Sequence, residues 1–218
     1  MNKFNCVGHL TEVKGEYSIE IEKKASKNYS FIKRVMDIIL SIIGLLIGIP
    51  LIIIFSILIY FESPGNVIFK QERVGKGGQI FTLYKLRSMC LDAEKNGQHW
   101  AQKNDPRVLK IGKFIRKTRI DEIPQLINIL KGEMSIVGPR PEVLKFTVEF
   151  NAQYPGFINR LQVNPGLTGL AQVSGGYDIG PGEKLKKDLE YIQQQSLWLD
   201  IKIILKTIKV IITGDGAR

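Results

Sequence analysis

The stretch that decides the fold is KRVMDIILSIIGLLIGIPLIIIFSILIYFE, residues 33–62. From Ile38 to Phe61 it contains no charged residue. At about 1.5 Å rise per residue, these roughly two dozen residues form a helix about 36 Å long, enough to cross a hydrocarbon core of about 30 Å. The stretch is too long and too apolar for an ordinary helix of a soluble core. It therefore predicts that membrane lipids hold the chain.

Pro50 lies in the middle of this run. Proline removes one backbone hydrogen bond from a helix and kinks or breaks it. Positive residues favour the cytoplasmic side of a membrane. The run has basic residues on both flanks, namely Lys33 and Arg34 before it and Lys70, Arg73 and Lys76 after it. A single crossing would put one basic flank outside the cell. We therefore expect a re-entrant helix–break–helix that turns at Pro50, with a straight, mildly kinked span as the alternative.

An acidic residue, Asp37, lies about one turn inside the apolar boundary. An ionised carboxylate at that depth is costly unless it is paired. Lys33 and Arg34 precede it at the spacing that brings side chains together on a helix. We expect one of these two residues to pair with Asp37.

The overall charge predicts an anionic partner. The 218 residues carry a formal net charge of +10, which is typical of proteins that bind nucleic acid, a membrane surface or a phosphorylated substrate. We expect no nucleic-acid partner, because the apolar run would then have no role. The length predicts one domain. We divide the chain into a polar extension (1–30), a membrane helix (31–62) and a cytosolic domain with interfacial helices (63–218).

Two carboxylates lie side by side in TRIDEIPQL, residues 118–126. Asp121 and Glu122 follow a basic run, and nearby opposite charge lowers the pKa of a carboxyl group, so we expect both to be ionised. An ionised carboxylate can attack phosphorus, bind a hard cation or accept a proton. The structural alternative is that Asp121 caps a helix and Glu122 complements the helix dipole. The basic residues are Lys110, Lys113, Arg116, Lys117 and Arg119.

Further cations are suited to binding phosphate. Arg140 lies between Pro139 and Pro141, and because proline fixes φ, Arg140 loses little backbone freedom when it engages a ligand. A guanidinium binds phosphate oxygens in a bidentate manner. Lys85 and Arg87 lie at the end of a predicted strand. For these two residues a solvated basic edge is the alternative.

The remaining pattern predicts an α+β fold that is mostly helical. Residues 67–69 and 80–84 are typical of strands and predict a small β-hairpin around a glycine-rich turn. Two of the predicted helices combine an apolar face with lysines or arginines, so we expect them to lie at the lipid interface. These interfacial amphipathic helices are 107–117 and 197–212. The other expected elements are a helix over 122–130, a short strand or buried segment over 167–173 and a helix over 183–195.

Five stretches, KRVMDIILSIIG (33–44), VIFKQERVG (67–75), FTLYKLRSM (81–89), IDEIPQLINILKGEMSIVGPRPE (120–142) and NPGLTGLAQVSG (164–175), carry a resemblance to a known family. In this order they resemble the monotopic phosphoglycosyl transferases, the bacterial sugar transferase family that starts lipid-linked glycan synthesis. The resemblance covers most of the chain from about residue 31 onward. The chain looks like the small form of the family, without the extra membrane bundle of some relatives.

The resemblance implies a reaction. Such enzymes move a sugar 1-phosphate from a nucleotide diphosphate sugar, usually a UDP-sugar, to undecaprenyl or another polyprenol phosphate and release UMP. The match implies that Asp121 is the nucleophile of a covalent aspartyl–phosphosugar intermediate, with Mg²⁺ bound at Asp121. It implies that Glu122 is the second catalytic acid, which assists by proton transfer or positioning. The expected substrate-binding residues are Arg116, Arg140, Pro139, Lys85 and Arg87.

The resemblance also implies a location and a pathway. We expect the bacterial inner (cytoplasmic) membrane, with the catalytic domain (63–218) on the cytosolic face and in contact with membrane lipids. The reaction would be the first membrane step of capsule, exopolysaccharide or glycoconjugate synthesis. A non-catalytic membrane adaptor for glycan assembly enzymes is the alternative function. The residues leave open which sugar is moved, whether the chain forms a homo-oligomer and what residues 1–30 do.

Three positions depart from the family pattern. A serine commonly precedes the helix-breaking proline, whereas this chain has Ile49, which lacks a hydroxyl that could satisfy freed carbonyls. Asn164 and Gly176 stand where the family often has arginine. We expect these departures to bear on the helix angle, on substrate preference and on activity.

Overall fold

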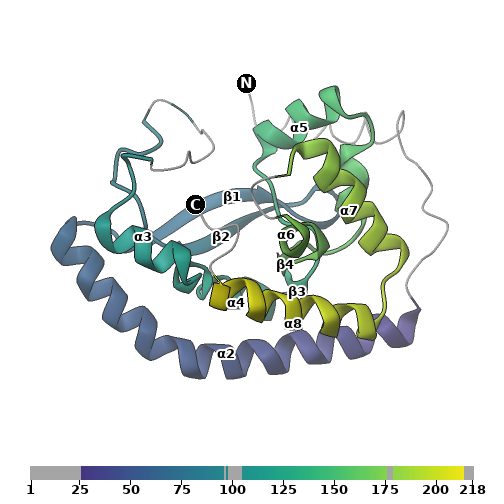
Figure 1. The fold of residues 1–218 in the computed structure, drawn as a ribbon, viewed down its shortest axis with the longest axis horizontal. Coiled ribbons are helices and arrows are strands. Elements are labelled where there is room, and N and C mark those ends of the chain that lie inside the picture. Colours follow the sequence, from purple (N-terminus) through teal and green to yellow (C-terminus); the bar gives the residue numbers. More distant parts are fainter. Residues whose placement is uncertain (1–25, 96, 98–104, 176–178, 214–218) are drawn as a thin grey trace.

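One long helix runs beneath a small α+β domain (Figure 1). The structure, a computed structural model, describes residues 26–95, 97, 105–175 and 179–213. In chain order the elements, with η for a 3-10 helix, are α2 (Lys27–Glu62), β1 (Ile68–Val74), η1 (Lys76–Gly78), β2 (Ile80–Leu86), α3 (Lys110–Lys117), η2 (Ile120–Glu122), α4 (Gln125–Lys131), β3 (Ser135–Val137), α5 (Leu144–Gln153), η3 (Phe157–Gln162), β4 (Gly166–Thr168), α6 (Leu170–Ser174), α7 (Pro181–Gln193) and α8 (Leu197–Thr213).

The apolar run forms one helix and not two. α2 is 36 residues long and passes through Pro50 without interruption, so the predicted helix–break–helix is wrong in that respect. Proline removes one hydrogen bond and tends to bend a helix, and the ribbon of α2 bends around the domain (Figure 1). α2 is the one helix in the described part of the chain that is long and apolar enough to cross a membrane.

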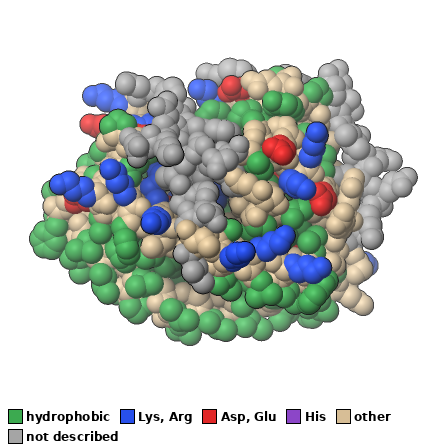
Figure 2. Space-filling model, in the orientation of Figure 1, with side chains coloured by type: hydrophobic (Ala, Val, Ile, Leu, Met, Phe, Trp, Pro, Cys, Tyr) green, Lys and Arg blue, Asp and Glu red, His purple; other side chains and the backbone are tan. Residues whose placement is uncertain are grey.

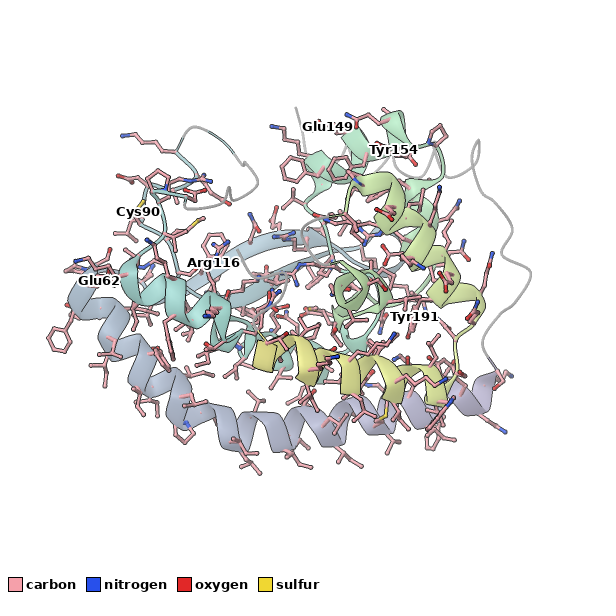
Figure 3. The ribbon with its side chains drawn as sticks, in the orientation of Figure 1. Glu62, Cys90, Arg116, Glu149, Tyr154 and Tyr191 are labelled. Carbon is pink, nitrogen blue, oxygen red and sulfur yellow. The ribbon has the colours of Figure 1, made fainter. Side chains whose placement is uncertain are left out.

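Both ends of α2 are fixed to the same domain. Near its start, Lys33 pairs with Asp200 of α8 at 2.9 Å. At its end, the Glu62 carboxylate accepts hydrogen bonds from the first two backbone N–H groups of α3, that of Lys110 at 2.6 Å. Figure 3 shows Glu62 beside the start of α3. The domain therefore lies along the concave side of α2, between its two ends.

Two glycines let α2 approach the domain closely between these ends. A Cβ atom at Gly44 would lie 2.8 Å from Cδ1 of Leu126, and one at Gly48 would lie 2.5 Å from Cγ2 of Ile123. Small residues allow helices to pack closely in this way. The contact places η2 and α4 directly against the middle of α2.

Asp37 binds the domain instead of its own helix. Its Oδ1 accepts from the Ser135 hydroxyl at 3.1 Å and from the Ile136 N–H at 2.9 Å. Lys33 and Arg34, the two predicted partners, bind α8 and the last carbonyls of α4. The prediction was wrong because β3 offers two donors directly to a carboxylate that is buried, and buried polar groups are nearly always hydrogen-bonded.

Two short sheets hold the loops of the domain. The predicted hairpin is confirmed: β1 and β2 are antiparallel, with Ile68 opposite Leu86 and Val74 opposite Ile80. β3 and β4 pair in parallel, which the sequence pattern did not predict. The main core lies between these sheets, α4 and the C-terminal helices, and its buried residues are Phe81, Leu83, Leu126, Ile129, Met134, Ile136, Val137, Tyr191, Ile192 and Ile203.

Several predicted elements have different bounds in the structure. The helices expected over 183–195 and 197–212 are present as α7 and α8, and α3 is shorter than predicted. The expected helix 122–130 divides into η2 and α4, and the expected strand 167–173 divides into β4 and α6. α5 and η3 were missed.

Apolar side chains cover the side of the molecule formed by α2 (Figure 2). α8 adds further exposed apolar residues, and Lys202, Lys206 and Lys209 are exposed along it. A contiguous apolar surface of this kind marks a membrane or partner surface. This apolar face includes Phe31, Ile39, Ile42, Ile43, Leu46, Ile47, Ile53, Ile54 and Ile57 of α2 and Trp198, Leu205 and Ile208 of α8.

Candidate active site

Asp121 and Glu122 lie in η2, a single 3-10 turn between α3 and α4. The residue before this turn, Arg119, has a left-handed backbone with φ 59°, the only non-glycine among the described residues with positive φ. Such strain is typical of functional sites. α4 begins after Pro124, with no side chain capping its first turn. The alternative interpretation of Asp121 as a helix cap is therefore wrong.

Three cations surround Glu122. Its Oε1 accepts from Arg140 Nη2 at 2.6 Å and from Lys85 Nζ at 3.0 Å, and Arg119 Nη1 lies 3.9 Å away. Burial alone would raise the pKa of Glu122, but the charges of Arg140, Lys85 and Arg119 outweigh it and hold the pKa well below its ordinary value. Glu122 therefore stays ionised and links cations from three separate segments.

Asp121 is similarly buried but has no such partner. Its residue is 7% exposed, and its Oδ1 is enclosed without a hydrogen bond to any described residue. Burial raises the pKa of Asp121 to about 6, with Lys85 opposing the rise and the charge of Glu122 adding to it. We expected nearby cations to lower the pKa of Asp121. This prediction was wrong, because the effect of burial on the pKa is larger than that of the cations. The carboxylate is ionised at neutral pH yet poorly stabilised, which suits a nucleophile or a metal ligand.

The acid pair lines a cavity of about 920 Å³. Its lining residues come from the hairpin, α3, η2, α5, η3, α6, α7 and the connecting segments. In Figure 1, α3 lies on one side of the hairpin and α5, α6 and α7 lie on the other. This volume is typical of small-molecule sites. Cations outnumber acids around it, which suits an anionic ligand. The cations are Lys70, Arg73, Lys85, Arg87, Arg116, Arg119, Arg140, Arg160 and Lys184, and the acids are Glu94, Asp121, Glu122 and Glu142.

The structure brings most of the predicted substrate-binding residues together. Four of them line the cavity with the acid pair: Lys85, Arg87, Arg116 and Arg140. Pro139 is buried and does not line it, and its carbonyl accepts from the Gly166 N–H at 2.9 Å. Pro139 therefore holds the loop that presents Arg140. Pro50 lies in α2, outside the cavity.

Arg87 is a buried cation with unused donors. Its Nη2 donates to the Ser63 carbonyl, whereas Nε and Nη1 are enclosed without a hydrogen bond to a described residue. Burial lowers the pKa of Arg87. A guanidinium in this state is suited to receiving an anionic group from the cavity.

Sequence reasoning missed part of the site. Arg119 was grouped with the basic run, although its position two residues before Asp121 was a signal for a direct role. Phe146, Arg160 and Lys184 also line the cavity, and no motif marks them. They reach the site only because α5, η3 and α7 fold against the hairpin side of the domain.

Asn164, one of the departures from the family pattern, donates from Nδ2 to the Gly132 carbonyl at 3.2 Å. Ile49 is exposed on α2. Gly176 lies outside the described residues.

The donor set around Asp121 fits a magnesium site that a substrate completes. The described residues contain no cluster of three His, Cys, Asp or Glu side chains that could hold a metal alone. Mg²⁺ is often bound by one or two carboxylates together with substrate phosphates. The enclosed Oδ1 of Asp121 is an acceptor of that kind, whereas Glu122 is already bound by cations.

The fold and the site define a class. The chain belongs to the bacterial sugar transferase family, whose family model matches residues 28–214. It is 48% identical over 193 residues to a UDP-N-acetylgalactosamine-undecaprenyl-phosphate N-acetylgalactosaminephosphotransferase from Aeromonas hydrophila, covering 87% of this chain and 46% of that protein. It is 40% identical over 193 residues to a UDP-glucose:undecaprenyl-phosphate glucose-1-phosphate transferase from Caulobacter vibrioides, covering 85% of this chain and 71% of that protein.

A UDP-glucose:undecaprenyl-phosphate glucose-1-phosphate transferase from Escherichia coli is 41% identical over 182 residues, covering 81% of this chain and 39% of that protein. The chain thus spans less than half the length of the Aeromonas and Escherichia proteins. The matched part contains Asp121, Glu122 and the cavity.

Proposed function

We propose that this chain is a membrane-bound phosphoglycosyl transferase that moves a sugar 1-phosphate from a UDP-sugar to undecaprenyl phosphate and releases UMP. The observation that carries the proposal is the contrast between two adjacent buried carboxylates in a cation-lined cavity. Glu122 is bound by cations, whereas Oδ1 of Asp121 is enclosed with no hydrogen-bonding partner among the described residues. The names of the relatives support the acceptor and the class of donor.

In the first half-reaction, Asp121 attacks the phosphorus that carries the sugar. A bond forms between a carboxylate oxygen and this phosphorus, the bond to the bridging oxygen breaks, and UMP leaves with the electron pair. Lys85, Arg116 and Arg119, whose charges act on Asp121, neutralise the phosphate oxygens as the carboxylate approaches. A covalent aspartyl–phosphosugar remains.

In the second half-reaction, a phosphate oxygen of undecaprenyl phosphate attacks the same phosphorus. The bond from phosphorus to Asp121 breaks, which regenerates the carboxylate and leaves the sugar joined to undecaprenol by a diphosphate. Glu122 acts by positioning, because a carboxyl group with a pKa well below its ordinary value is a poor proton donor. Two successive displacements give ping-pong kinetics.

Asp121 would hold Mg²⁺ together with the phosphates of the donor. When bound, Mg²⁺ shields the diphosphate charge and polarises the phosphoryl oxygens. Arg116, Arg119 and Arg140 line the same cavity and keep the phosphates in place by charge-assisted hydrogen bonds.

We further propose that α2 is re-entrant and that the domain lies on the cytosolic face of the inner membrane. Both ends of α2 bind the same domain, so a straight crossing would draw polar domain residues into lipid, which is costly. Basic residues on both flanks favour the cytosolic side. The Gly48–Ile123 contact then holds Asp121 close to the membrane, where a soluble donor and a lipid acceptor can both reach it.

The proposed product belongs at the first membrane step of capsule, exopolysaccharide or glycoconjugate synthesis. The test uses the purified chain in lipid nanodiscs with undecaprenyl phosphate, Mg²⁺ and a panel of UDP-sugars that includes UDP-N-acetylgalactosamine. We expect UMP release with at least one sugar, its loss in Asp121→Asn and its retention in the exposed control Asp92→Asn. No UMP release from the wild type with any sugar would favour the adaptor alternative.

A further inference from the structure

One wall of the cavity has no role in the chemistry above. It is formed by residues of α5, η3, α6 and α7 and by the residue that precedes α5, and we call it the α5–α7 wall. Two cations and an amide lie beside three apolar side chains on it. The residues of the α5–α7 wall are Val143, Phe146, Arg160, Ala171, Gln172 and Lys184.

Arg160 is a buried cation whose charge is already neutralised. Its residue is 3% exposed, and its Nε and Nη2 lie 2.9 Å and 2.6 Å from Oδ2 of Asp188, whose side chain is 1% exposed. The guanidinium also lies over the Phe157 ring, 4.8 Å from its centre. These contacts fix the guanidinium plane, while Nη1 has no hydrogen bond to another described residue. A fixed donor of this kind recognises an acceptor at one defined place.

Phe146 gives the wall an aromatic surface. Its ring stacks on Phe150 of the same helix, with 5.8 Å between the ring centres and 15° between the ring planes. Val143 and Ala171 line the cavity with it. A fixed aromatic ring among aliphatic side chains is suited to a planar heterocycle, because aromatic rings and bases stack.

We propose that the α5–α7 wall binds the pyrimidine base of the donor nucleotide, with Phe146 packed on the face of the base and Arg160 donating to a base carbonyl oxygen. The inference rests on the proposed function, since the phosphorus of the donor must reach Asp121 and its nucleoside end must extend elsewhere in the cavity. The phosphates meet Lys85, Arg116 and Arg119 beside Asp121.

Charge favours the base over a phosphate at this wall. Asp188 offsets the charge of Arg160, and its carboxylate would repel a second anion brought to the same guanidinium. A neutral carbonyl oxygen gains the hydrogen bond without that repulsion. Uracil offers such carbonyl acceptors on a flat ring that Phe146 can cover.

The test measures UMP binding by calorimetry with the full chain in nanodiscs. We expect Phe146→Leu to weaken UMP binding roughly tenfold, the effect of losing one base–aromatic stack. The double variant Arg160→Gln/Asp188→Asn, which removes both charges together and leaves neither unpaired, should weaken it similarly. Tyr154→Leu, an aromatic residue at the end of α5 that does not line the cavity, is the matched control and should bind UMP as the wild type does.

Steady-state kinetics separate base recognition from other roles. The Michaelis constant for the UDP-sugar should rise in Phe146→Leu, with little change in that for undecaprenyl phosphate, because base contacts are equal in the ground and transition states. Unchanged UMP binding in Phe146→Leu, or a wild type that does not bind UMP, would overturn the inference. A change in preference among UDP-sugars with UMP binding unaltered would place the sugar at this wall and overturn it as well.

Failure of the proposed function would show separately, as a wild type that releases no UMP from any UDP-sugar. The UMP titration still decides the inference in that case, because it requires no turnover. If the double variant does not fold, as thermal unfolding would show, Phe146→Leu decides alone.

Discussion

Arg140 Nη2 lies 2.6 Å from Oε1 of Glu122, the residue that directly follows Asp121. This contact assigns different roles to two neighbouring acids. Glu122 engages the cations and remains ionised, while Asp121 is buried and its Oδ1 has no hydrogen-bonding partner among the described residues. Asp121 and Glu122 both carry a carboxyl group, so their surroundings distinguish them, as in other sites with two carboxylates.

Glu122→Gln should lower activity and shift its pH dependence. The charge of Glu122 raises the pKa of Asp121, so without it Asp121 ionises at lower pH. Wild-type UMP release should rise with pH through about 6, and the midpoint of the variant should lie below that of the wild type. Loss of the negative charge weakens the bonds that Oε1 accepts from Arg140 and Lys85, which should reduce the rate roughly ten- to hundredfold. Initial rates over a pH series test this, and an unchanged midpoint would contradict it.

Asp121→Asn should stabilise the folded protein at neutral pH. The folded-state pKa of about 6 exceeds the ordinary 3.8, so between these values the folded chain keeps a proton that the unfolded chain has lost. The stability linked to this proton is fully present below the ordinary pKa and is lost as pH rises through about 6, by on the order of 2 kcal/mol. Asparagine at this position stays neutral at all pH values, so the variant does not lose this stability as the pH rises.

Thermal unfolding in detergent checks this stability prediction. The Asp121→Asn variant should unfold at a higher temperature than the wild type above about pH 7 and at nearly the same temperature in acid. A variant that is less stable than the wild type at neutral pH would show that ionised Asp121 is better stabilised than its surroundings indicate.

Gly48→Val should separate α2 from the catalytic turn. A Cβ at this position would lie 2.5 Å from Cγ2 of Ile123, so the larger side chain must displace the segment that follows Asp121. We expect a loss of about 1–3 kcal/mol of stability and a fall in activity of about a hundredfold, since small displacements of reacting groups are costly. Ile47→Val, at an adjacent residue that is 67% exposed, is the matched control. Full activity in Gly48→Val would contradict the close contact.

The topology of α2 can be tested by cysteine labelling in intact cells. In a cysteine-free background, Asn28→Cys places an exposed thiol in the first turn of α2, and Gln79→Cys places one after the end of α2. A re-entrant helix keeps both on the cytosolic side, so a membrane-impermeant maleimide should label neither until the cells are permeabilised. Labelling of Asn28→Cys from outside would establish a straight crossing.

Patterns within one segment of the sequence correctly predicted the elements that depend on that segment alone. The apolar run, the hairpin and α8 each follow from composition or periodicity within one segment. Pro50 was expected to break α2, but the domain packs against both halves of the helix and holds it continuous. The helix spacing that predicted Lys33 or Arg34 as the partner of Asp37 failed because Ser135 and Ile136, far along the chain, supply the hydrogen bonds.

The site was predicted only in part for the same reason. The acid pair and several cations were evident from residue types, but burial was not, and burial raises the pKa of Asp121 where nearby charges alone would lower it. No pattern of residues predicted that Lys85, Arg119 and Arg140 converge on Glu122. The α5–α7 wall was missed because no periodic pattern brings Phe146 and Arg160 together.

The most direct test of the account is the intact mass of the protein after incubation with the UDP-sugar and Mg²⁺ in the absence of undecaprenyl phosphate. We predict that the wild type gains the mass of one sugar phosphate, that Asp121→Asn gains none, and that adding undecaprenyl phosphate discharges the adduct. An adduct that persists in Asp121→Asn, or that peptide mapping places on another residue, would contradict the role of Asp121 as nucleophile.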